Sequence, residues 1–374
     1  MNYFDKLDHR SARMREKYPT RPRKAAASML MWTVKNLFPK ADKTVFTDGR
    51  LHIAVSVLGG LGDLFFAARY VERLSRYFGQ KVTVCMENSA AYAQPVFGGL
   101  SGVEAIVAPN GAPCDIKIRL VRFPEIVFCD FKRLKAVGDS KIKAYVQSLL
   151  DFRSGFPLVY NNDYFGYRYA QAKGKKREDQ PDIDGILHLA DVSLNIPAAD
   201  PQIGKPFITI QTGYGEHFKG VESETRQWGV EKYERLIELL KQEYPRFKTV
   251  QIGADYHPRI QETDFDLRGK TSIPEVFGLL KNAALHIQQE GGFAIARHYL
   301  CGKPSVVLFG PTDEKFLGFP ENLNLRAPGF ECICEGLTQK WYQKCLKTGG
   351  CAACMRALSA QTVFEKIKES KILE

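Results

Sequence analysis

Short runs of apolar residues alternate along this chain with longer stretches whose apolar positions recur every three or four residues. The short runs predict buried strands and the longer stretches predict amphipathic helices. Regular alternation of the two is typical of α/β proteins with parallel sheets. In the first half, the pattern predicts strands at 51–58, 81–85, 103–107, 115–118 and 125–129, and helices at 64–78 and 139–150. In the second half, it predicts strands at 207–211, 249–253, 285–289 and 305–309, and helices at 230–243, 273–283, 293–301 and 360–372.

A length of 374 residues is enough for two domains. Residues 170–205 have little strand signal and are rich in Lys, Asp and Pro, which predicts a boundary there. The expected organisation is a basic arm over 1–50, Rossmann-like domains over 51–200 and 205–330, a cysteine-rich segment over 331–356 and a last helix within 357–374.

Two glycine-rich turns each follow an apolar strand and precede a helix: residues 59–63, which read GGLGD, and residues 290–292, which read EGG. Glycines let a ligand approach the backbone, and the free N–H groups of a helix N-terminus favour a phosphate or diphosphate. Such a turn fits a purely structural role equally well. Thr212 and Gly213 end another strand and are expected to face the same cleft.

Asp63 follows the first glycine-rich turn, at the carboxyl edge of the expected parallel sheet. Open α/β sheets bind their ligands at that edge. Two interpretations stay open: a helix N-cap, which Asp often provides, and a general base that faces a cleft.

Four segments, in this order, resemble glycosyltransferase family 9, the ADP-heptose:lipopolysaccharide heptosyltransferases and their relatives. They are GGLGD (59–63), TRQWGVEKYERLIELL (225–240), LRGKTSIPEVFGLLKNAALHIQQEGG (267–292) and GKPSVVLFGPTD (302–313). The resemblance covers roughly residues 50–370 and implies a GT-B fold, in which an acceptor-side domain and a nucleotide-sugar domain face each other across a cleft. It also implies a last helix that crosses back to the first domain.

The resemblance further implies an inverting sugar transfer with Asp63 as the base. Arg226 stands where the family places a Lys before Trp228, and a guanidinium can bind the leaving diphosphate through two N–H groups. Backbone N–H groups and the helix dipole add to this stabilisation. The implied donor-binding residues are Gly60, Gly62, Thr212, Gly213, Glu290, Gly291, Gly292 and Thr312.

Two positions depart from the family pattern. Glu290 replaces the usual Asp, and Ile295 stands where the family has a His. His298 lies nearly one helical turn further on, where it either substitutes or packs. These departures leave the exact sugar open, with ADP-heptose as the expected donor. They also keep open a catalytically silent sugar-nucleotide-binding or scaffold protein, although a pure binder would not need Asp63.

Five of the nine cysteines lie within 23 residues near the C-terminus: Cys332, Cys334, Cys345, Cys351 and Cys354. Four of them could form a tetrahedral Zn or Fe site with a structural role. Reduced or redox-paired thiols are the alternative. Family members that heptosylate autotransporter proteins bind iron through a cysteine cluster, and this tail resembles theirs. The transfer itself needs no metal.

The arm over 1–50 holds 12 of the 53 Lys and Arg residues but only 5 of the 42 Asp and Glu residues. Its basic and apolar positions fit an anionic membrane surface, or an arm that packs on its own domain or a second subunit. No nucleic-acid-binding pattern and no apolar run of 18 residues occur. We therefore expect a cytoplasmic protein whose basic arm lies either on the inner membrane surface or on protein, and whose acceptor is a lipopolysaccharide-core sugar or a protein hydroxyl.

Overall fold

The structure, a computed structural model, describes residues 46–374 apart from 110, 112, 156–162, 201, 205, 215–224, 336, 338–340, 347 and 349–351. Most of the basic arm over 1–50 therefore lies outside the described residues, and its membrane or packing role stays a prediction. Among the helices of the described part, none combines the length and apolar character that crossing a bilayer requires.

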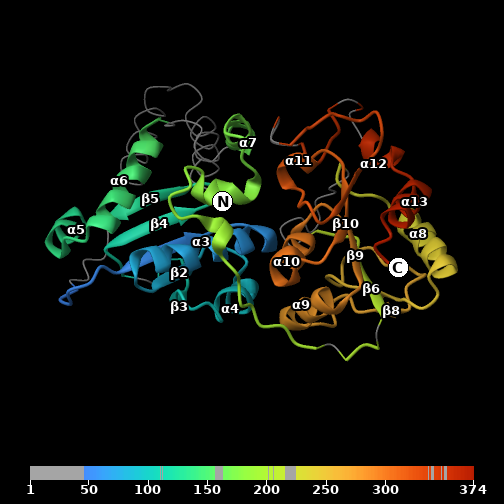
Figure 1. Ribbon diagram of the computed structural model, residues 1–374, viewed down its shortest axis with the longest axis horizontal. Coiled ribbons are helices and arrows are strands. Elements are labelled where there is room, and N and C mark those ends of the chain that lie inside the picture. Colours follow the sequence, from blue (N-terminus) through green and yellow to red (C-terminus); the bar gives the residue numbers. More distant parts are fainter. Residues whose placement is uncertain are drawn as a thin grey trace, which may run out of the picture. The chain divides into compact units, whose positions relative to one another are not determined.

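The first sheet has the strand order β3-β2-β1-β4-β5 (Figure 1). Its strands are β1 (Ile53–Val57), β2 (Val82–Met86), β3 (Val103–Val107), β4 (Ile116–Leu120) and β5 (Pro124–Cys129). All five residues of β1 are buried, as expected for a central parallel strand with both faces covered. The sequence predicts each of these strands to within a few residues.

One connection in this sheet differs from the expected regular alternation of strand and helix. β5 pairs with β4 in the antiparallel direction. Only residues 121–123 join the two strands, and a parallel crossover needs a dozen residues or more. The expectation of a wholly parallel first sheet is therefore wrong at this edge.

The second sheet is parallel throughout its pairings and has the strand order β11-β10-β9-β6-β7-β8. Its strands are β6 (Phe207–Gln211), β7 (Lys248–Gln251), β8 (Phe265–Asp266), β9 (Leu285–Gln289), β10 (Ser305–Phe309) and β11 (Leu323–Arg326). β8 and β11 are short outer strands that the hydrophobic pattern does not predict, because edge strands need no continuous apolar run.

The helices of the first half are α3 (Leu61–Phe78), α4 (Ala93–Phe97), α5 (Phe131–Val137), α6 (Ser140–Gly155) and α7 (Asp163–Ala172). Those of the second half are α8 (Val230–Glu243), α9 (Ile273–Asn282), α10 (Gly292–Cys301), α11 (Glu314–Leu317), α12 (Ala353–Ala357) and α13 (Ala360–Ser370). α9 begins with a capping box, in which the backbone N–H of Ser272 donates to Glu275 Oε2 at 2.7 Å.

The last helix, α13, packs beside α8 (Figure 1). Its buried residues Val363, Phe364 and Ile367 belong to the hydrophobic core of the second sheet. The sequence resemblance predicts a helix that returns to the first domain, whereas the apolar face of α13 is covered by α8 and β11.

The stretch predicted as a domain boundary lies between the two sheets, but it is not a simple linker. We call residues 163–191 the connector; it contains α7 and two 3₁₀ helices, η2 (Arg177–Asp182) and η3 (Leu189–Asp191). Arg177 and Gln180 of the connector are buried, and η2 packs on α3. A charged residue of the connector, Arg177, therefore takes part in the folded core, which the composition of this stretch does not predict.

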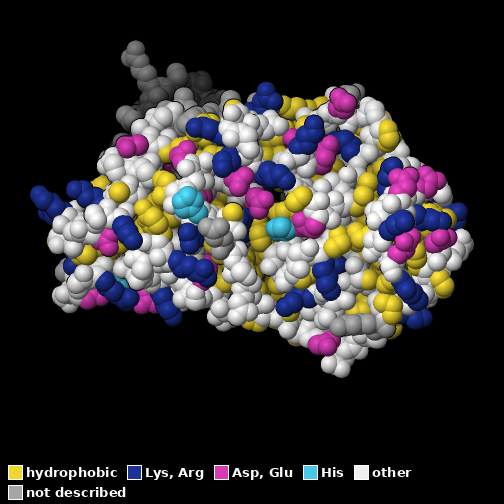
Figure 2. Space-filling view, in the orientation of Figure 1, with side chains coloured by type: hydrophobic (Ala, Val, Ile, Leu, Met, Phe, Trp, Pro, Cys, Tyr) yellow, Lys and Arg dark blue, Asp and Glu magenta, His cyan; other side chains and the backbone are white. Residues whose placement is uncertain are grey.

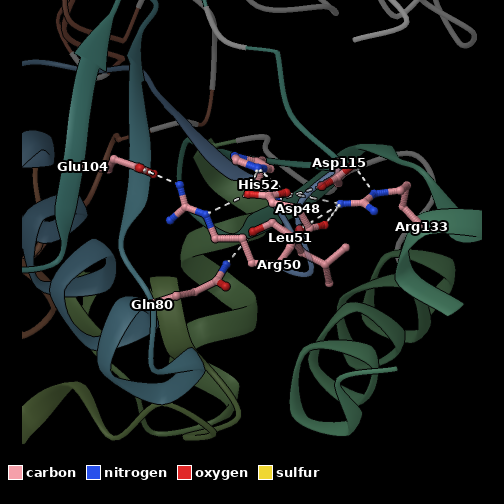
Figure 3. Close-up of polar contacts among 8 residues, drawn as sticks. All are labelled: Asp48, Arg50, Leu51, His52, Gln80, Glu104, Asp115 and Arg133. Atoms are coloured by element: carbon pink, nitrogen blue, oxygen red, sulfur yellow. Dashed lines mark hydrogen bonds and ion pairs between the residues drawn. The ribbon is translucent and has the colours of Figure 1, made fainter. Parts of the chain in front are cut away.

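A polar network fixes the chain where it enters β1 (Figure 3). Buried Asp115 accepts hydrogen bonds from the backbone N–H of His52 at 2.8 Å and from Arg133 Nε at 3.4 Å. Arg133 Nη2 also donates to the carbonyl of Arg50 at 2.9 Å. These contacts hold the amino edge of the first sheet, opposite the edge that carries the glycine-rich turn at 59–63.

Basic and acidic side chains are interspersed over the face drawn in Figure 2.

Candidate functional site

The two glycine-rich turns contact each other. A Cβ atom added to Gly62 would lie 2.5 Å from Ile295 Cδ1 and 3.4 Å from Gly292 Cα, and one added to Gly292 would lie 3.0 Å from the backbone N of Gly62. The helices α3 and α10, which begin at these turns, lie side by side (Figure 1). Two helix N-termini, each with free N–H groups and positive dipole character, therefore meet at one place.

The glycines of the two turns are needed for different reasons. Gly59 has a φ of +143°, a conformation that disfavours other residues. Its neighbours Gly60, Gly62, Gly291 and Gly292 do not have positive φ in this range. Gly62 and Gly292 are instead required because a side chain at either would separate α3 from α10.

Asp63 lies in the first turn of α3, three positions after the N-cap residue Gly60. Its Oδ2 accepts a hydrogen bond from the backbone N–H of Gly60 at 3.1 Å, and its Oδ1 accepts one from Arg177 Nη2 at 2.6 Å. The side chain is still 38% exposed. The carboxylate thus supports the helix terminus without occupying the N-cap position, and it stays accessible from solvent.

Arg177, the partner of Asp63, is a site residue that sequence reasoning missed. It is only 9% exposed, and its guanidinium lies 5.1 Å from the centre of the Phe66 ring. Burial lowers the pKa of Arg177, and the Asp63 carboxylate acts in the opposite direction. Nothing in the KGKKREDQPDID stretch, residues 173–184, distinguishes this arginine from its charged neighbours.

The next residue of the connector contacts the second half of the chain. Glu178 Oε2 accepts hydrogen bonds from the hydroxyl of Tyr299 at 2.7 Å and from Arg69 Nη1 at 3.1 Å. Arg69 Nη1 also donates to the Tyr299 hydroxyl at 2.7 Å. Since Arg69 belongs to α3 and Tyr299 to α10, this three-residue network joins the two helices through η2.

Arg226 lies beside the second turn, as the sequence predicts. Its Nη2 donates to the carbonyl oxygen and to Oε2 of Glu290, both at 2.8 Å, and its guanidinium lies 4.4 Å from the centre of the Tyr214 ring. Burial opposes the charge of Arg226, but Glu290 and neighbouring groups more than offset it, so its pKa is raised. A diphosphate that binds here must compete with the Glu290 carboxylate.

Thr212 and Gly213 are placed behind the site. The Thr212 hydroxyl donates to the carbonyl of Pro258 at 2.8 Å, and its own carbonyl accepts from Gln289 Nε2 at 2.8 Å. A Cβ atom on Gly213 would collide with the ring of His257. These contacts fix the end of β6, and they occupy the hydroxyl of Thr212.

Three further positions of the motifs have structural contacts. Thr312 is buried, and its carbonyl accepts from Arg326 Nη2. Ile295 packs on Gly62, which explains an apolar residue at this position. His298 Nδ1 lies 2.6 Å from Glu321 Oε1, and its ring stacks on Phe319 at 3.7 Å between centres. Of the two interpretations of His298, the structure therefore favours packing.

The tryptophan of the second motif anchors the C-terminal segment. Trp228 is buried, and its indole N–H donates to the carbonyl of Leu358 at 2.8 Å. Lys232 Nζ donates to the carbonyls of Met355 at 2.8 Å and Arg356 at 2.7 Å. The motif residues after Arg226 thus hold the segment that carries Cys354.

Four of the five clustered cysteines line one small cavity, of about 10 Å³: Cys332, Cys334, Cys345 and Cys354. This is close to the space that one water molecule needs. Burial, with the neighbouring thiols, raises the pKa of Cys334 to about 11 and also raises that of Cys354. Cys351 lies outside the described residues. Within the described ones, no group of three or more His, Cys, Asp or Glu side chains is arranged to hold a metal ion.

Comparison with known proteins identifies the fold. No protein-family model matches the chain, and no curated protein matches it in sequence. The structure is similar to that of TibC, an iron-containing dodecameric heptosyltransferase from enterotoxigenic E. coli, solved with ADP-D-beta-D-heptose. The TM-score is 0.60 at 14% identity, over 86% of this chain and 77% of TibC.

Two other solved structures are also similar. The glycosyl transferase family 9 protein of Veillonella parvula has a TM-score of 0.51 at 13% identity, over 86% of this chain and 97% of that one. E. coli ADP-heptose lps heptosyltransferase II has a TM-score of 0.50 at 14% identity, over 86% and 99%. These likenesses confirm the expected GT-B fold with two α/β domains, and they agree with the family 9 resemblance of the sequence motifs.

Proposed function

We propose that this protein is an inverting glycosyltransferase that uses a nucleotide-activated sugar. The observation that carries the proposal is the contact between the two glycine-rich turns. It brings an accessible carboxylate, Asp63, next to the N-termini of α3 and α10. Arg226 adds a cation beside the second turn. Base, anion-binding N–H groups and cation are the groups that such a transfer requires.

In the proposed reaction, the acceptor hydroxyl oxygen attacks the anomeric carbon of the donor sugar. Asp63 takes the hydroxyl proton as the new carbon–oxygen bond forms. The bond between the anomeric carbon and the diphosphate breaks, and the nucleoside diphosphate leaves with the electron pair. The N-terminus of α10 and the Arg226 guanidinium stabilise the negative charge that grows on the diphosphate. Attack opposite the leaving group inverts the configuration.

We propose ADP-heptose as the donor, because the motifs resemble those of heptosyltransferases and TibC was solved with this compound. The proposed acceptor is a lipopolysaccharide-core sugar or a protein hydroxyl. A silent sugar-nucleotide-binding protein is the second candidate. The pairing of Glu290 with Arg226 favours it, because the site's cation is already neutralised by a side chain.

The test of the proposal is a thermal-shift panel of ADP-heptose and UDP-, GDP- and CMP-sugars, followed by a transfer assay with the stabilising compound. A donor that binds only the native state raises the melting temperature. Stabilisation by one nucleotide sugar, with release of its nucleoside diphosphate, supports the enzyme. Stabilisation without release supports the silent binder, and no stabilisation by any compound contradicts both.

We also propose a structural metal, Fe or Zn, at the cysteine cavity. Four thiols around a cavity of atomic size are a donor set that either metal accepts in tetrahedral geometry. Because the described arrangement is not itself a metal site, the proposal requires the thiols to draw closer or Cys351 to take part. The metal would fasten the tail to the Gly310-Pro311-Thr312 turn, where the backbone N–H of Cys334 already donates to Pro311 at 2.8 Å.

Elemental analysis of the purified protein is expected to find about one Fe or Zn per chain. The Cys334→Ser/Cys354→Ser variant is expected to lose that metal and to melt at a lower temperature. Thiolates, not thiols, bind the metal, so its retention should weaken as the pH falls. The Cys85→Ser variant, changed at a buried thiol of β2, is the control and should keep the metal. The proposal would be contradicted if the wild-type protein is folded without metal and melts at the same temperature as the Cys334→Ser/Cys354→Ser variant.

A further inference from the structure

Two adjacent residues of the connector contact the two halves of the candidate site. Arg177 Nη2 donates to Asp63 Oδ1 at 2.6 Å, in the first turn of α3. Glu178 Oε2 accepts from the hydroxyl of Tyr299 at 2.7 Å, on α10. Since α10 begins at the second glycine-rich turn, η2 links the candidate base to the helix of the donor side.

Contacts on several sides hold the guanidinium of Arg177 in place. The cation lies on the ring of Phe66, and Nη2 also reaches the carbonyl of Val121 at 3.4 Å. η2 is itself fixed at both ends: Asp179 Oδ2 accepts from the backbone N–H of Lys176 at 2.9 Å, and Asp182 accepts from that of Leu187 at 3.0 Å. A guanidinium held in this way can fix the orientation of a carboxylate.

The acceptors that its N–H groups bind distinguish Arg177 from an arginine with a purely structural role. Arg297 is also buried, but its Nε, Nη1 and Nη2 all donate to backbone carbonyls. Arg177 donates to one carboxylate, and its buried Nη1 has no hydrogen-bond partner among the described residues. Buried donors are almost always paired, so the Nη1 that is unpaired in the described part of the chain marks Arg177 as an arginine whose contacts are centred on the Asp63 carboxylate and not on the backbone.

We infer that Arg177 is the positioning residue of the base Asp63, and that the contact of Glu178 with Tyr299 makes this positioning depend on the docking of α10 against the connector. The inference rests on the proposed function, in which Asp63 removes the acceptor proton. The carboxylate is in its working orientation only while the donor-side helix lies against η2. Undocking of α10 breaks the bond from Tyr299 to Glu178 and leaves Glu178 its ion pair with Arg69, so one of the contacts that hold η2 in place depends on assembly of the donor site.

The test measures release of ADP from ADP-heptose with water as the acceptor. The Arg177→Ala variant is expected to lower kcat by about 10²-fold, the scale of a misplaced catalytic group, and to change the donor KM by less than about threefold. Asp63 is partly exposed, so water can replace its lost partner and the fold should persist. Added guanidinium ion should restore part of the rate, and Arg177→Lys should keep more activity than Arg177→Ala.

Two further variants complete the design. Tyr299→Phe removes the hydroxyl that donates to Glu178 and accepts from Arg69, and we expect a loss of about tenfold in kcat. Combined with Arg177→Ala, it should add little, because residues that act through one path are not additive. Arg168→Ala, at an exposed position of α7, should leave the rate unchanged.

The outcomes separate this inference from the proposed function. If Asp63→Asn abolishes ADP release while Arg177→Ala retains it, the base stands and the role of Arg177 is overturned. Loss of activity in Arg177→Ala that guanidinium does not restore, with a lowered melting temperature, also overturns it in favour of a structural role. Full additivity of the two losses overturns the link through Tyr299. A wild-type protein that releases no nucleoside diphosphate from any nucleotide sugar of the panel overturns both proposals.

Discussion

Replacing Asp63 by Asn is expected to lower sugar transfer by about 10²- to 10⁴-fold, the range over which a positioned general base contributes. The amide cannot take the acceptor proton. Its oxygen can still accept a hydrogen bond from Arg177 or from the backbone N–H of Gly60. The variant leaves the backbone of both turns and Arg226 unchanged, and these are the proposed donor contacts, so the thermal shift with the donor should be kept.

Asn is a better probe here than Ala. Arg177 is almost fully buried, and removal of the Asp63 carboxylate, with which it forms an ion pair, would leave its charge poorly compensated. A loss of activity in Asp63→Ala would therefore mix chemistry with instability. Glu104→Gln is the matched control, because it makes the same change in a carboxylate that pairs with an arginine, Arg50, at 2.8 Å on the exposed surface. Transfer by Asp63→Asn at the wild-type rate would remove Asp63 from the mechanism.

The central elements of both sheets could be predicted because burial on both faces leaves an unambiguous signal. β1, β6, β9 and β10 are continuous apolar or fully buried runs, and each is found within three residues of its expected position. The outer strands β8 and β11 and the short helix α11 carry no such signal. Their formation depends on neighbours that are distant in sequence.

Those parts of the site that a single short segment forms could be predicted from the sequence. The turns at 59–63 and 290–292 could be recognised, since glycines between a strand and a helix are visible in the sequence. Their contact could not, because it depends on how α3 packs on α10. Arg177 and Glu178 were hidden for the same reason: a charged segment that crosses both halves has the composition of a solvated linker.

Long-range packing also explains why two residues of the motifs have contacts that their sequence positions do not predict. Thr212 is polar and ends a strand, which is typical of a binding position, yet Pro258 and Gln289 take its hydrogen bonds. Ile295 departs from the motif because it fills the contact with Gly62. In both cases the partner lies more than 40 residues away, and only tertiary packing decides between ligand binding and support of the turn.

Replacing Arg297 by Met is expected to lower the free energy of unfolding by about 3 to 5 kcal/mol, the cost of breaking a buried polar arrangement from one side. Arg297 is fully buried in α10. Its guanidinium donates to the carbonyls of Leu280, Ala283 and Ala284, at the end of α9 and the approach to β9, and to Pro304 before β10 at 3.1 Å. Burial lowers its pKa to about 10.

Methionine fills a similar volume but leaves these carbonyl oxygens without donors in a place that water does not reach. Chemical denaturation followed by circular dichroism measures the change as a lower midpoint. Arg297→Lys should lose less, since an ammonium keeps part of the hydrogen bonding. Arg235→Met, at an arginine of α8 that is 55% exposed, should change stability by no more than about 0.5 kcal/mol. If Arg297→Met unfolds at the wild-type midpoint, the arginine does not hold α9, β9 and β10 together.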